Sequence, residues 1–523
     1  MAELSGCTIG IELGSTRIKS VLIDERCNIV CSGSYEWENK LENGIWTYDL
    51  NDAVKGIQSC YRELKRNYKT LTGKVISKVG SIGISGMMHG YIVLDKKGNL
   101  LSPFRTWRNT ITQKESEELS EIFSFNVPQR WSISHLYQVI RSNEEYIRDI
   151  DSLMTLSSYI HYLLTGEKCV GIGDASGMFP VDSSTLNYDR EMIEKFDSIT
   201  KENIGKSIRS ILPKVMVAGE NAGVLSKEGA LLLDEDGDLM SGIPLCPPEG
   251  DAGTGMVATN SIKVGSGNVS AGTSIFAMIV TGKRTLPHRE IDIVSTPDGK
   301  DVAMVHCNNC TSDINAWVNL FLEYSSLMGF EVNKSDVFEK LFKASLEGDP
   351  DCGGLVNFNY LSGEEITKLN AGIPLFLRKP DSIFSLSNFM RAQISSAFVT
   401  LKMGIDILQN EGVKIERLLG HGGIFKTEGV AARILSSALS IPILTMTNAG
   451  EGGPYGMALL ALYMIEKEQF CSLDEFLEEK VFKDSVIRED RAGEKEQLGF
   501  SSFSRLYEKS LPLESLAVEK INK

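Results

Sequence analysis

The sequence predicts an α/β protein with two related domains that face each other across a cleft. The chain has 523 residues, which is more than one hydrophobic core usually supports. Short apolar runs and turns fill the first hundred residues, with a helical pattern between two of the runs. The chain begins with a strand, a small-residue turn and a second strand, and this pattern returns at 268–280. A repeated element at the start of each half indicates a duplicated domain.

The first half begins with strands at 8–13, 18–24 and 28–35, which are short apolar runs separated by turns. Consecutive runs of this kind predict an antiparallel meander. Residues 51–68 place apolar side chains at helical spacing, and 79–85 is expected to form a buried strand. A helix-rich part follows from about residue 112 to residue 165.

Gly250, Gly253 and Gly255 make the stretch 249–260 flexible, and we expect the domain boundary near 255–262, so we divide the chain into domains 1–258 and 259–523. Strands continue to about residue 306, and 415–423 is a strand that leads into a glycine turn. The expected helices of this half cover 311–329, 335–346, 387–410, 428–439 and 453–465.

Composition and charge exclude several classes of protein. The net charge is −15 and the pI is about 5.1, which argues against binding to nucleic acid or an anionic membrane. No apolar run reaches about 18 residues, so no membrane span is expected. The first residues lack signal-peptide features and the ten cysteines are scattered, so we expect a cytoplasmic protein with reduced thiols. For the lone C-x-x-C pair of Cys307 and Cys310, a structural role is favoured over a metal or redox role.

Both small-residue turns offer backbone N–H groups and hydroxyls at a hairpin tip. Two such tips facing each other across a cleft could hold the β- and γ-phosphates of a nucleotide. Lys19 lies close enough in sequence to assist, although it could equally be a surface lysine of a strand. Neither a P-loop nor a strand-linked G-x-G-x-x-G occurs here, so both of those nucleotide sites are excluded. The candidate phosphate-binding residues are Gly14, Ser15, Thr16, Lys19, Gly272, Thr273 and Ser274.

Two acids accompany these turns. Glu12 ends an apolar run directly before the first turn, where it would repel a phosphate unless a metal ion lay between them. Asp251 stands among small residues in "PEGDAGTG" (248–255), where its carboxylate could accept a proton from a hydroxyl that attacks phosphorus. A capping aspartate in a turn is an equally good interpretation of Asp251.

Aromatic and polar residues in the first half suit a sugar. His89 follows Met88 at the end of "ISGMMHG" (84–90), and Trp107 and Arg108 lie in "FRTWRNT" (104–110). A tryptophan face can cover the apolar face of a sugar while neighbouring polar groups bind its hydroxyls. Taken singly, His89 and Trp107 would more often be partly buried structural residues.

Two glycine clusters in the second half could admit a planar base against bare backbone. The first is "LGHGGIFKTEG" (419–429), which contains Gly422 and Gly423, and the second is "NAGEGGPYG" (448–456). Close helix packing is the alternative for both clusters, and it is the stronger interpretation for the second.

Taken in order, these segments resemble the FGGY carbohydrate kinases. "GIELGSTRIKS" is similar to the first phosphate motif of that family, "SGMMHG" to a segment of its xylulokinase-like members, and "PEGDAGTG" to the segment with the catalytic aspartate. "SAGTS" resembles the second phosphate motif and "LGHGGIFKTEG" the adenosine motif, while "LTGE", "GDASGM" and "YLSGE" also fit. The resemblance covers nearly the whole chain. It implies two actin-like (ribonuclease H-like) domains with an interdomain catalytic cleft.

The resemblance also implies roles for individual residues. Asp251 is the general base that activates a sugar hydroxyl, and Mg²⁺ bridges ATP phosphates near Glu12 and Asp251. The ATP-binding residues are Gly14, Ser15, Thr16, Lys19, Gly272, Thr273, Ser274, Gly422 and Gly423. The substrate-binding residues are Met88, His89, Trp107, Arg108 and Asp251.

Several positions depart from the family pattern. The family has aspartate where this chain has Glu12, and its xylulokinase-like members have glutamine at Met87. The usual Trp-x-Asp-x-Arg becomes "WRNTI", so the acid is the amide of Asn109 and the arginine is replaced by Ile111. Ile424 and Lys426 also depart from the adenosine motif, which has small and Ser or Asn residues there. The phosphate-binding residues are therefore better retained than the residues that read the sugar.

The resemblance implies ATP-dependent phosphorylation of a sugar hydroxyl, with a ketopentose such as xylulose as the nearest substrate. Kinases for ribulose, a deoxyketose, gluconate or a polyol are alternatives, and so is a non-catalytic sugar or nucleotide sensor on the same fold. An actin-like filament protein fits poorly, because it would have no use for the sugar-pocket segments. The expected partner is a small-molecule sugar, without nucleic acid or membrane, and a homodimer is a compatible assembly.

Overall fold

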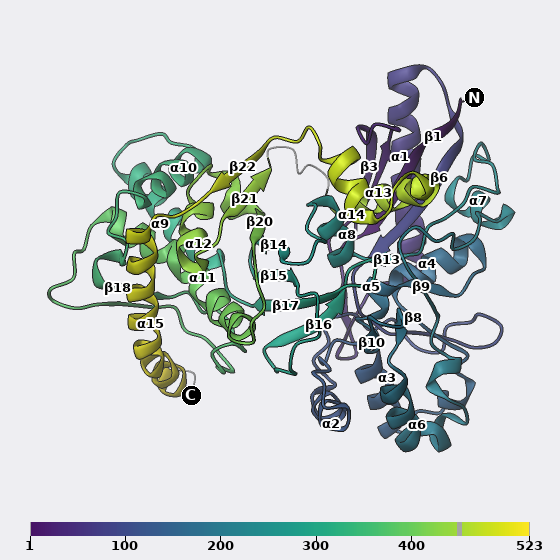
Figure 1. The fold of residues 1–523 in the computed structure, drawn as a ribbon, viewed down its shortest axis with the longest axis horizontal. Coiled ribbons are helices and arrows are strands. Elements are labelled where there is room, and N and C mark those ends of the chain that lie inside the picture. The colour runs from purple at the N-terminus through teal and green to yellow at the C-terminus, as the bar shows by residue number, and fades with distance from the viewer. Residues whose placement is uncertain (1, 447–451, 522–523) are drawn as a thin grey trace.

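The computed structural model describes residues 2–446 and 452–521. Its first half contains a five-stranded mixed sheet in the order β13-β6-β1-β2-β3 (Figure 1). Strand β1 is parallel to β6 and antiparallel to β2, and β13 is parallel to β6. The strands are β1 (Ala2–Leu13), β2 (Arg17–Ile23), β3 (Ile29–Glu36), β6 (Ile76–Gly86) and β13 (Glu249–Gly250).

The second half contains a seven-stranded mixed sheet in the order β16-β17-β15-β14-β20-β21-β22. Strand β14 is antiparallel to β15 and parallel to β20, as β1 is to β2 and β6. This shared pattern confirms the predicted α/β fold with two related halves. The strands are β14 (Ser266–Ala271), β15 (Ile275–Val280), β16 (Ile291–Ser295), β17 (Asp301–Cys307), β20 (Arg417–His421), β21 (Ile443–Met446) and β22 (Ile487–Asp490).

Short two-stranded ribbons complete the strand set. They pair β4 with β5, β7 with β8, β9 with β12, β10 with β11 and β18 with β19. Their bounds are β4 (Lys40–Glu42), β5 (Ile45–Thr47), β7 (Ile92–Leu94), β8 (Ser152–Met154), β9 (Cys169–Gly171), β10 (Val181–Asp182), β11 (Asn187–Tyr188), β12 (Lys214–Met216), β18 (Leu355–Phe358) and β19 (Leu375–Arg378).

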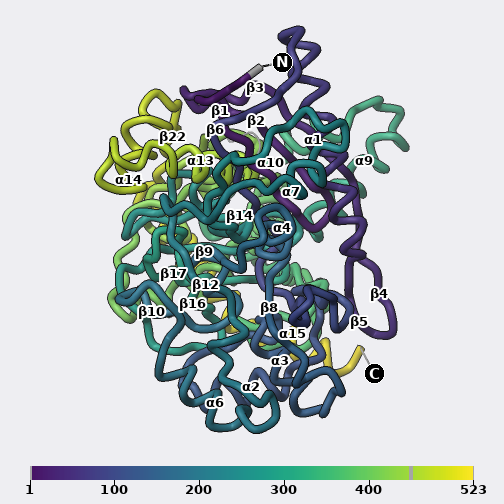
Figure 2. Tube along the Cα trace, turned by 90° about the vertical axis from the view of Figure 1, so that its right-hand side faces the viewer, coloured from purple at the N-terminus to yellow at the C-terminus, as the bar shows by residue number. Residues whose placement is uncertain are grey.

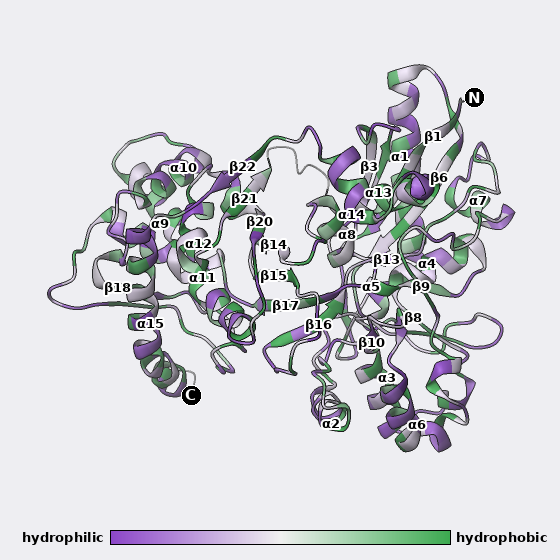
Figure 3. Cartoon of the chain, viewed as in Figure 1, coloured by the Kyte–Doolittle hydropathy of each residue, from purple (hydrophilic) through white to green (hydrophobic). Residues whose placement is uncertain are grey.

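Helices surround both sheets and mix hydrophilic with hydrophobic residues, whereas many sheet strands are hydrophobic (Figure 3). In the first half they are α1 (Leu50–Thr72), α2 (Gln113–Phe123), α3 (Ser132–Arg141), α4 (Leu156–Thr165), α5 (Ile172–Ala175), α6 (Arg190–Ile204), α7 (Lys227–Leu233) and α8 (Asp251–Ala258). In the second half they are α9 (Ser312–Leu327), α10 (Lys334–Ser345), α11 (Leu386–Asn410), α12 (Ala431–Leu439), α13 (Gly453–Glu466), α14 (Leu473–Phe476) and α15 (Glu494–Ile521). No helix within residues 2–446 and 452–521 is long and apolar enough to cross a membrane.

Helix α1 illustrates how local sequence builds these elements. Asp49 caps the first turn by accepting a hydrogen bond from Asn51 N–H, and Gly73 ends the helix in the left-handed region. Buried side chains that include Ile57 and Leu64 recur at helical spacing and pack the helix onto β2 and β3. Gly33 of β3 allows the approach, because a Cβ there would lie 2.1 Å from the Cys60 carbonyl oxygen of the helix.

Helix α13 comes from the second half of the chain but packs against the first sheet, beside α8 (Figures 1 and 2). Thr8 of β1 donates a hydrogen bond to the Ala458 carbonyl oxygen at 2.9 Å, and Ser81 of β6 donates to that of Ala461 at 2.8 Å. A Cβ at Gly10 would lie 2.0 Å from the Pro454 carbonyl oxygen. The first sheet is therefore completed by a helix that follows the second sheet in sequence.

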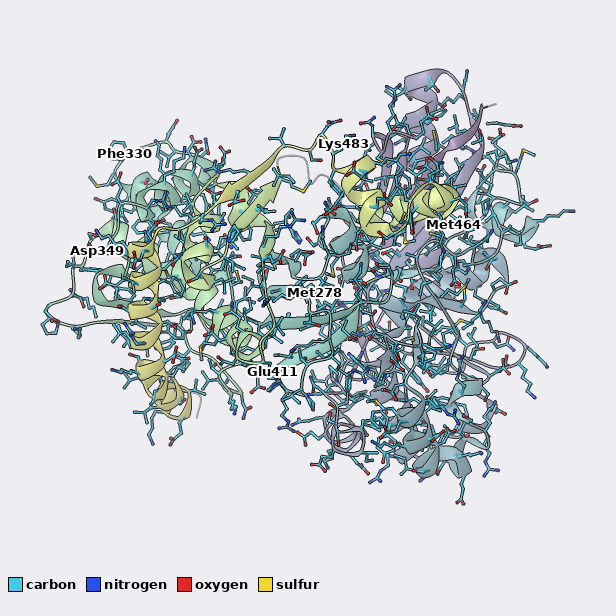
Figure 4. All side chains as sticks on the ribbon, viewed as in Figure 1. Met278, Phe330, Asp349, Glu411, Met464 and Lys483 are labelled. Atoms are coloured by element: carbon cyan, nitrogen blue, oxygen red, sulfur yellow. The ribbon has the colours of Figure 1, made fainter. Side chains whose placement is uncertain are left out.

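Met278 of β15 is buried in the second sheet near the middle of the molecule, whereas Phe330 lies at the outer edge of the second half (Figure 4). Between the two halves, β16 and its preceding loop reach the first half. Ser295 N–H donates a hydrogen bond to Ser176 Oγ at 2.9 Å. This contact, together with the packing of α13 against β1, fixes the two walls of a cleft.

Candidate active site

A cleft of about 1950 Å³ lies between the two halves. The predicted site residues that line it are Glu12, Ser15, Met88, His89, Trp107, Arg108, Asp251, Ser274 and Gly422. The other predicted residues flank these lining residues or face them across a hairpin, and they are Gly14, Thr16, Lys19, Gly272, Thr273 and Gly423. The fold thus brings the predicted acids, both hairpins and the aromatic segment to one cavity.

The first hairpin joins β1 and β2 through residues 14–16, and the carbonyl groups of all three turn residues accept hydrogen bonds from within the protein. Trp37 Nε1 donates a hydrogen bond to the Gly14 carbonyl oxygen at 2.7 Å, and the Tyr48 hydroxyl donates to that of Ser15 at 2.7 Å. The Thr16 carbonyl oxygen accepts a further bond from Trp37 N–H at 3.2 Å. With three successive carbonyls tied back, the negative ends of these peptide dipoles point away from an anion bound at the tip.

The second hairpin is held in the same way by the segment after β17. Thr311 donates to the Gly272 carbonyl oxygen from its N–H at 3.2 Å and from its hydroxyl at 2.7 Å. Cys310 N–H donates to the Thr273 carbonyl oxygen at 2.9 Å. The C-x-x-C segment therefore supports this hairpin through its backbone, while the thiols of Cys307 and Cys310 are buried.

Gly422 brings the end of β20 against the second hairpin. Its φ is +104°, and a Cβ there would lie 2.2 Å from the Ala271 carbonyl oxygen, so only glycine fits. Gly423 has open space around it. Of the departures from the adenosine motif, Ile424 points into the core and Lys426 is exposed. Residues 448–451 of the second glycine cluster lie outside the described residues.

Asp251 is the first residue of α8 and directly follows β13. Its Oδ1 accepts a hydrogen bond from Met88 N–H at 3.2 Å. Burial raises the pKa of this carboxyl to about 6, although the N–H groups of Met88 and Ala252 favour the ionised form. A carboxyl with a pKa near neutrality can release its proton in the resting site and take one up again during a reaction.

Glu12 is the penultimate residue of β1 and lies opposite Lys19 of β2, so both side chains face the same side of the hairpin. Its carboxyl group lies against the start of α13, where a Cβ at Gly453 would be 2.4 Å from Oε2. Burial and the nearby charge of Asp251 raise the pKa of Glu12 to about 8, and Lys19 opposes the shift. Two neighbouring carboxyl groups that resist joint ionisation are a suitable donor set for a divalent cation. Mg²⁺ commonly uses one or two carboxylates together with substrate phosphates.

His89 shapes the cleft wall but has both ring nitrogens engaged by protein groups. Nδ1 donates to the Gly177 carbonyl oxygen at 3.0 Å, and Nε2 accepts a bond from Arg130 Nε at 3.1 Å. Burial, together with Arg130, lowers the pKa of His89 to about 3, so the imidazole is neutral. Arg130 also pairs with Asp292 of β16, which ties this wall to the second half. His89 thus positions Arg130 in the cleft.

Trp107, Arg108 and Asn109 all line the cleft, but Trp107 and Arg108 are exposed whereas Asn109 is buried. The Arg108 guanidinium carbon lies 5.7 Å from the Trp46 ring centroid and 5.3 Å from that of Trp107. Asn109 fixes Trp46 by accepting its N–H at 2.8 Å and donating to its carbonyl oxygen at 2.8 Å. The Arg108 guanidinium thus lies over two indole rings, and we call Arg108, Trp46 and Trp107 together the Arg108 clamp.

Residues 7–257 match the FGGY family of carbohydrate kinases, N-terminal domain, and residues 267–465 match the FGGY family of carbohydrate kinases, C-terminal domain. The chain belongs to the FGGY carbohydrate kinases. It is therefore an enzyme of that family, as the order of its motifs predicted.

Sequence relatives and solved structures that resemble this FGGY kinase are themselves sugar kinases by name. A xylulose kinase of Haemophilus influenzae is 25% identical over 430 residues, covering 79% of this chain and 82% of the relative. A ligand-bound xylulose kinase structure from Lactobacillus acidophilus has a TM-score of 0.80 at 18% identity and covers 97% of this chain and 98% of its own. A gluconate kinase structure from the same organism has a TM-score of 0.79 at 17% identity, covering 98% and 99%. These structures share the fold of this FGGY kinase.

Sequence reasoning missed several residues that build the FGGY kinase site. Trp37 and Tyr48 hold the first hairpin and pack against each other with ring centroids 4.3 Å apart, and Trp46 forms one face of the Arg108 clamp. The available signal was a group of three aromatic residues within the polar stretch 36–49. Arg130 and Glu249 carried no local signal, because their partners are distant in sequence.

Proposed function

We propose that this kinase transfers the γ-phosphoryl group of ATP to a hydroxyl of a free sugar, with Asp251 as the general base. The observation that carries the proposal is the position of Asp251 at the start of α8. Residues of both hairpins, whose turn carbonyl groups are hydrogen-bonded within the protein, line the same cleft. We propose a ketopentose such as xylulose as the substrate. The name shared by the Haemophilus influenzae relative and a Lactobacillus acidophilus structure supports that choice. Gluconate is the next candidate, because a gluconate kinase has an almost equal TM-score.

In the proposed mechanism the two hairpins hold the nucleotide. The backbone N–H groups and hydroxyls of Ser15, Thr16 and Thr273 bind phosphate oxygens, with Gly14, Gly272, Ser274 and Lys19 completing the two tips. Gly422 and Gly423 provide bare backbone beside the adenosine. Positioning and charge stabilisation supply most of the rate enhancement in phosphoryl transfer.

Asp251 accepts the hydroxyl proton as the sugar oxygen attacks phosphorus. Mg²⁺, when bound, neutralises charge on the phosphate oxygens, and Glu12 and Asp251 are the residues that would hold it. Trp107 covers one face of the sugar, and Arg108 presents its guanidinium to the sugar hydroxyls. Met88 and His89 complete the wall on the Asp251 side.

We propose that residues 1–258 and 259–523 act as the two units that close over the substrates, with α13 crossing to the first. Closure would exclude water and limit wasteful hydrolysis of ATP. A cytoplasmic location and a homodimer are further proposals. The sedimentation coefficient of the purified protein tests the homodimer.

A coupled ADP-release assay over ketoses, aldoses, polyols and aldonates tests the proposed function. The expected result is turnover with one ketopentose, with kcat/KM at least about tenfold above that for other sugars. Turnover only with gluconate or a polyol would replace the substrate but keep the reaction. Tight ATP binding without turnover on any sugar would support a sensor and overturn the proposal.

A further inference from the structure

Glu249 is a buried acid that does not line the cleft. It forms β13 together with Gly250, pairs with Ser85 of β6, and directly precedes the Gly250–Asp251 corner. Its side chain is 2% exposed. A buried carboxylate is costly unless it is hydrogen-bonded, so its partners indicate what it does.

The carboxylate of Glu249 is bound by three backbone N–H groups. Oε1 accepts from Gly173 at 3.2 Å, and Oε2 accepts from Asp174 at 2.9 Å and from Gly250 at 3.3 Å. Two of these donors lie about 75 residues away in sequence. The side chain therefore joins the strand that leads to Asp251 to the start of α5.

Two glycines make room for this carboxylate. A Cβ at Gly171 would lie 2.2 Å from Oε1 of Glu249, and a Cβ at Gly173 would lie 2.5 Å from Oε2. Gly171 has φ −67° and ψ 148°, which any residue adopts, so its backbone does not require glycine. The space taken by the Glu249 carboxylate is what excludes a side chain there.

The donor segment is itself fixed. Asp174 Oδ2 accepts hydrogen bonds from the hydroxyls of Thr155 at 2.7 Å and Ser157 at 2.6 Å, at the start of α4. Gly171 N–H donates to the Pro248 carbonyl oxygen at 2.7 Å, which adds a second tie to the strand before Asp251. Glu249 thus links the hydrogen-bonded segment 171–174 to the backbone at Gly250 and Asp251.

Asp251 needs such a support. Outside its own helical turn, the hydrogen bond recorded for its carboxylate comes from Met88 N–H at 3.2 Å, so the backbone largely sets its direction. Displacing a reacting group by about 1 Å can cost about a hundredfold in rate. Resting on the proposed function, we propose that Glu249 is a positioning residue for the base Asp251, acting through its contacts with the backbone of residues 173–174 and 250.

Three variants test the proposal. In Glu249→Gln one oxygen becomes an NH₂ group, which must then face at least one of the three backbone N–H donors. The resulting repulsion is expected to shift the backbone at Gly250 and Asp251. In Gly171→Ala the added Cβ displaces the same carboxylate without changing any acid. The matched control is Glu514→Gln, since Glu514 of α15 is also fully buried and accepts one backbone N–H, from Ile373 at 2.8 Å, but lies outside the cleft lining.

We expect Glu249→Gln and Gly171→Ala each to lower kcat at least about tenfold, with the KM for ATP changed less than about threefold. The double variant is expected to lose no more than the worse single one, because both act through one contact. Glu514→Gln is expected to keep kcat within about twofold of wild type. A wild-type kcat in Glu249→Gln, additive losses, or an equal loss in Glu514→Gln would overturn the proposal.

A structural readout separates this proposal from the proposed function. If the wild-type protein phosphorylates no sugar, the proposed function fails. Crystal structures of wild type and Glu249→Gln then still decide the positioning role. A displaced Asp251 carboxylate would support it, and an unmoved carboxylate would overturn it.

Discussion

Asn109 and Trp46 are joined by two hydrogen bonds that run in opposite directions between one side-chain amide and one backbone unit. The Trp46 N–H donates to Asn109 Oδ1, the Asn109 Nδ2 donates to the Trp46 carbonyl oxygen, and both distances are 2.8 Å. Asn109 Nδ2 also donates to the Thr106 carbonyl oxygen at 2.9 Å. A carboxylate could not make the two donated bonds, so an amide is required here.

Replacing Asn109 by aspartate is therefore expected to weaken the Arg108 clamp. The new charge would face two carbonyl oxygens in a buried site, which should lower the free energy of unfolding by about 2–4 kcal/mol. The KM for the sugar should rise about tenfold because Trp46 is released. Thermal unfolding and steady-state kinetics measure both effects. The exposed Asn143→Asp serves as control, and equal behaviour of the two variants would contradict this account.

Asp251→Asn is expected to lower kcat for sugar phosphorylation on the order of a thousandfold, because the amide cannot accept the hydroxyl proton. Nucleotide binding should stay within about threefold of wild type, since the hairpins are unchanged. Quenched-flow kinetics and calorimetric titration with ATP measure the two quantities. Wild-type turnover in this variant would show that another group is the base.

The pH profile follows from the raised pKa of Asp251, about 6. Below that pH the carboxyl is protonated and cannot act as a base, so log kcat/KM should fall with slope 1 as the pH decreases through about 6. Well above that pH the base form is complete, so Asp251 adds no further pH dependence. Initial rates with subsaturating sugar measure this limb. An inflection near the ordinary aspartate pKa of about 4 would contradict the effect of burial.

Glu12→Asp tests the length of the acid beside α13. The shorter side chain withdraws the oxygens on the order of 1 Å or more. We expect the Mg²⁺ concentration for half-maximal rate to rise several-fold, with little change in the KM for the sugar. Titration of the rate with Mg²⁺ at saturating ATP measures it. An unchanged Mg²⁺ dependence would show that this length is immaterial.

Gly422→Ala is expected to raise the KM for ATP about tenfold or more, because the new Cβ would press on the Ala271 carbonyl oxygen at the second hairpin. The positive φ adds a strain of about 1–3 kcal/mol. Gly412→Ala is the matched control, since Gly412 also has a positive φ but no atom within 4 Å of its Cβ position. A similar rise in KM in both variants would assign the effect to strain alone.

Local sequence patterns predicted the elements well where one face of an element is buried. The helix expected at 51–68 is α1 (Leu50–Thr72), and both small-residue turns occur where expected, between β1 and β2 and between β14 and β15. Periodicity identifies such elements because burial repeats along them. For Asp251 the local pattern left a base and a capping aspartate equally open, and only the resemblance to the family favoured the base.

Contacts between distant segments were not predictable in this way. Nothing near Trp46 indicates that Asn109 will bind its backbone, since 63 residues separate them. The aromatic residues that hold the first hairpin, Trp37 and Tyr48, act on carbonyl groups that every residue possesses. A sequence pattern shows which side chains are available, whereas the fold decides which backbone groups they meet.

A polypeptide that stops near residue 260 would lack α13, whose carbonyl oxygens accept hydrogen bonds from the hydroxyls of Thr8 and Ser81. The face of β1 at Gly10 would then be uncovered, and a fragment of the first half should aggregate when expressed alone. Adding residues 452–466 in trans should restore its solubility. Exchange of catalytic halves between relatives would have to move α13 together with the first sheet, so the unit of recombination differs from the unit of duplication.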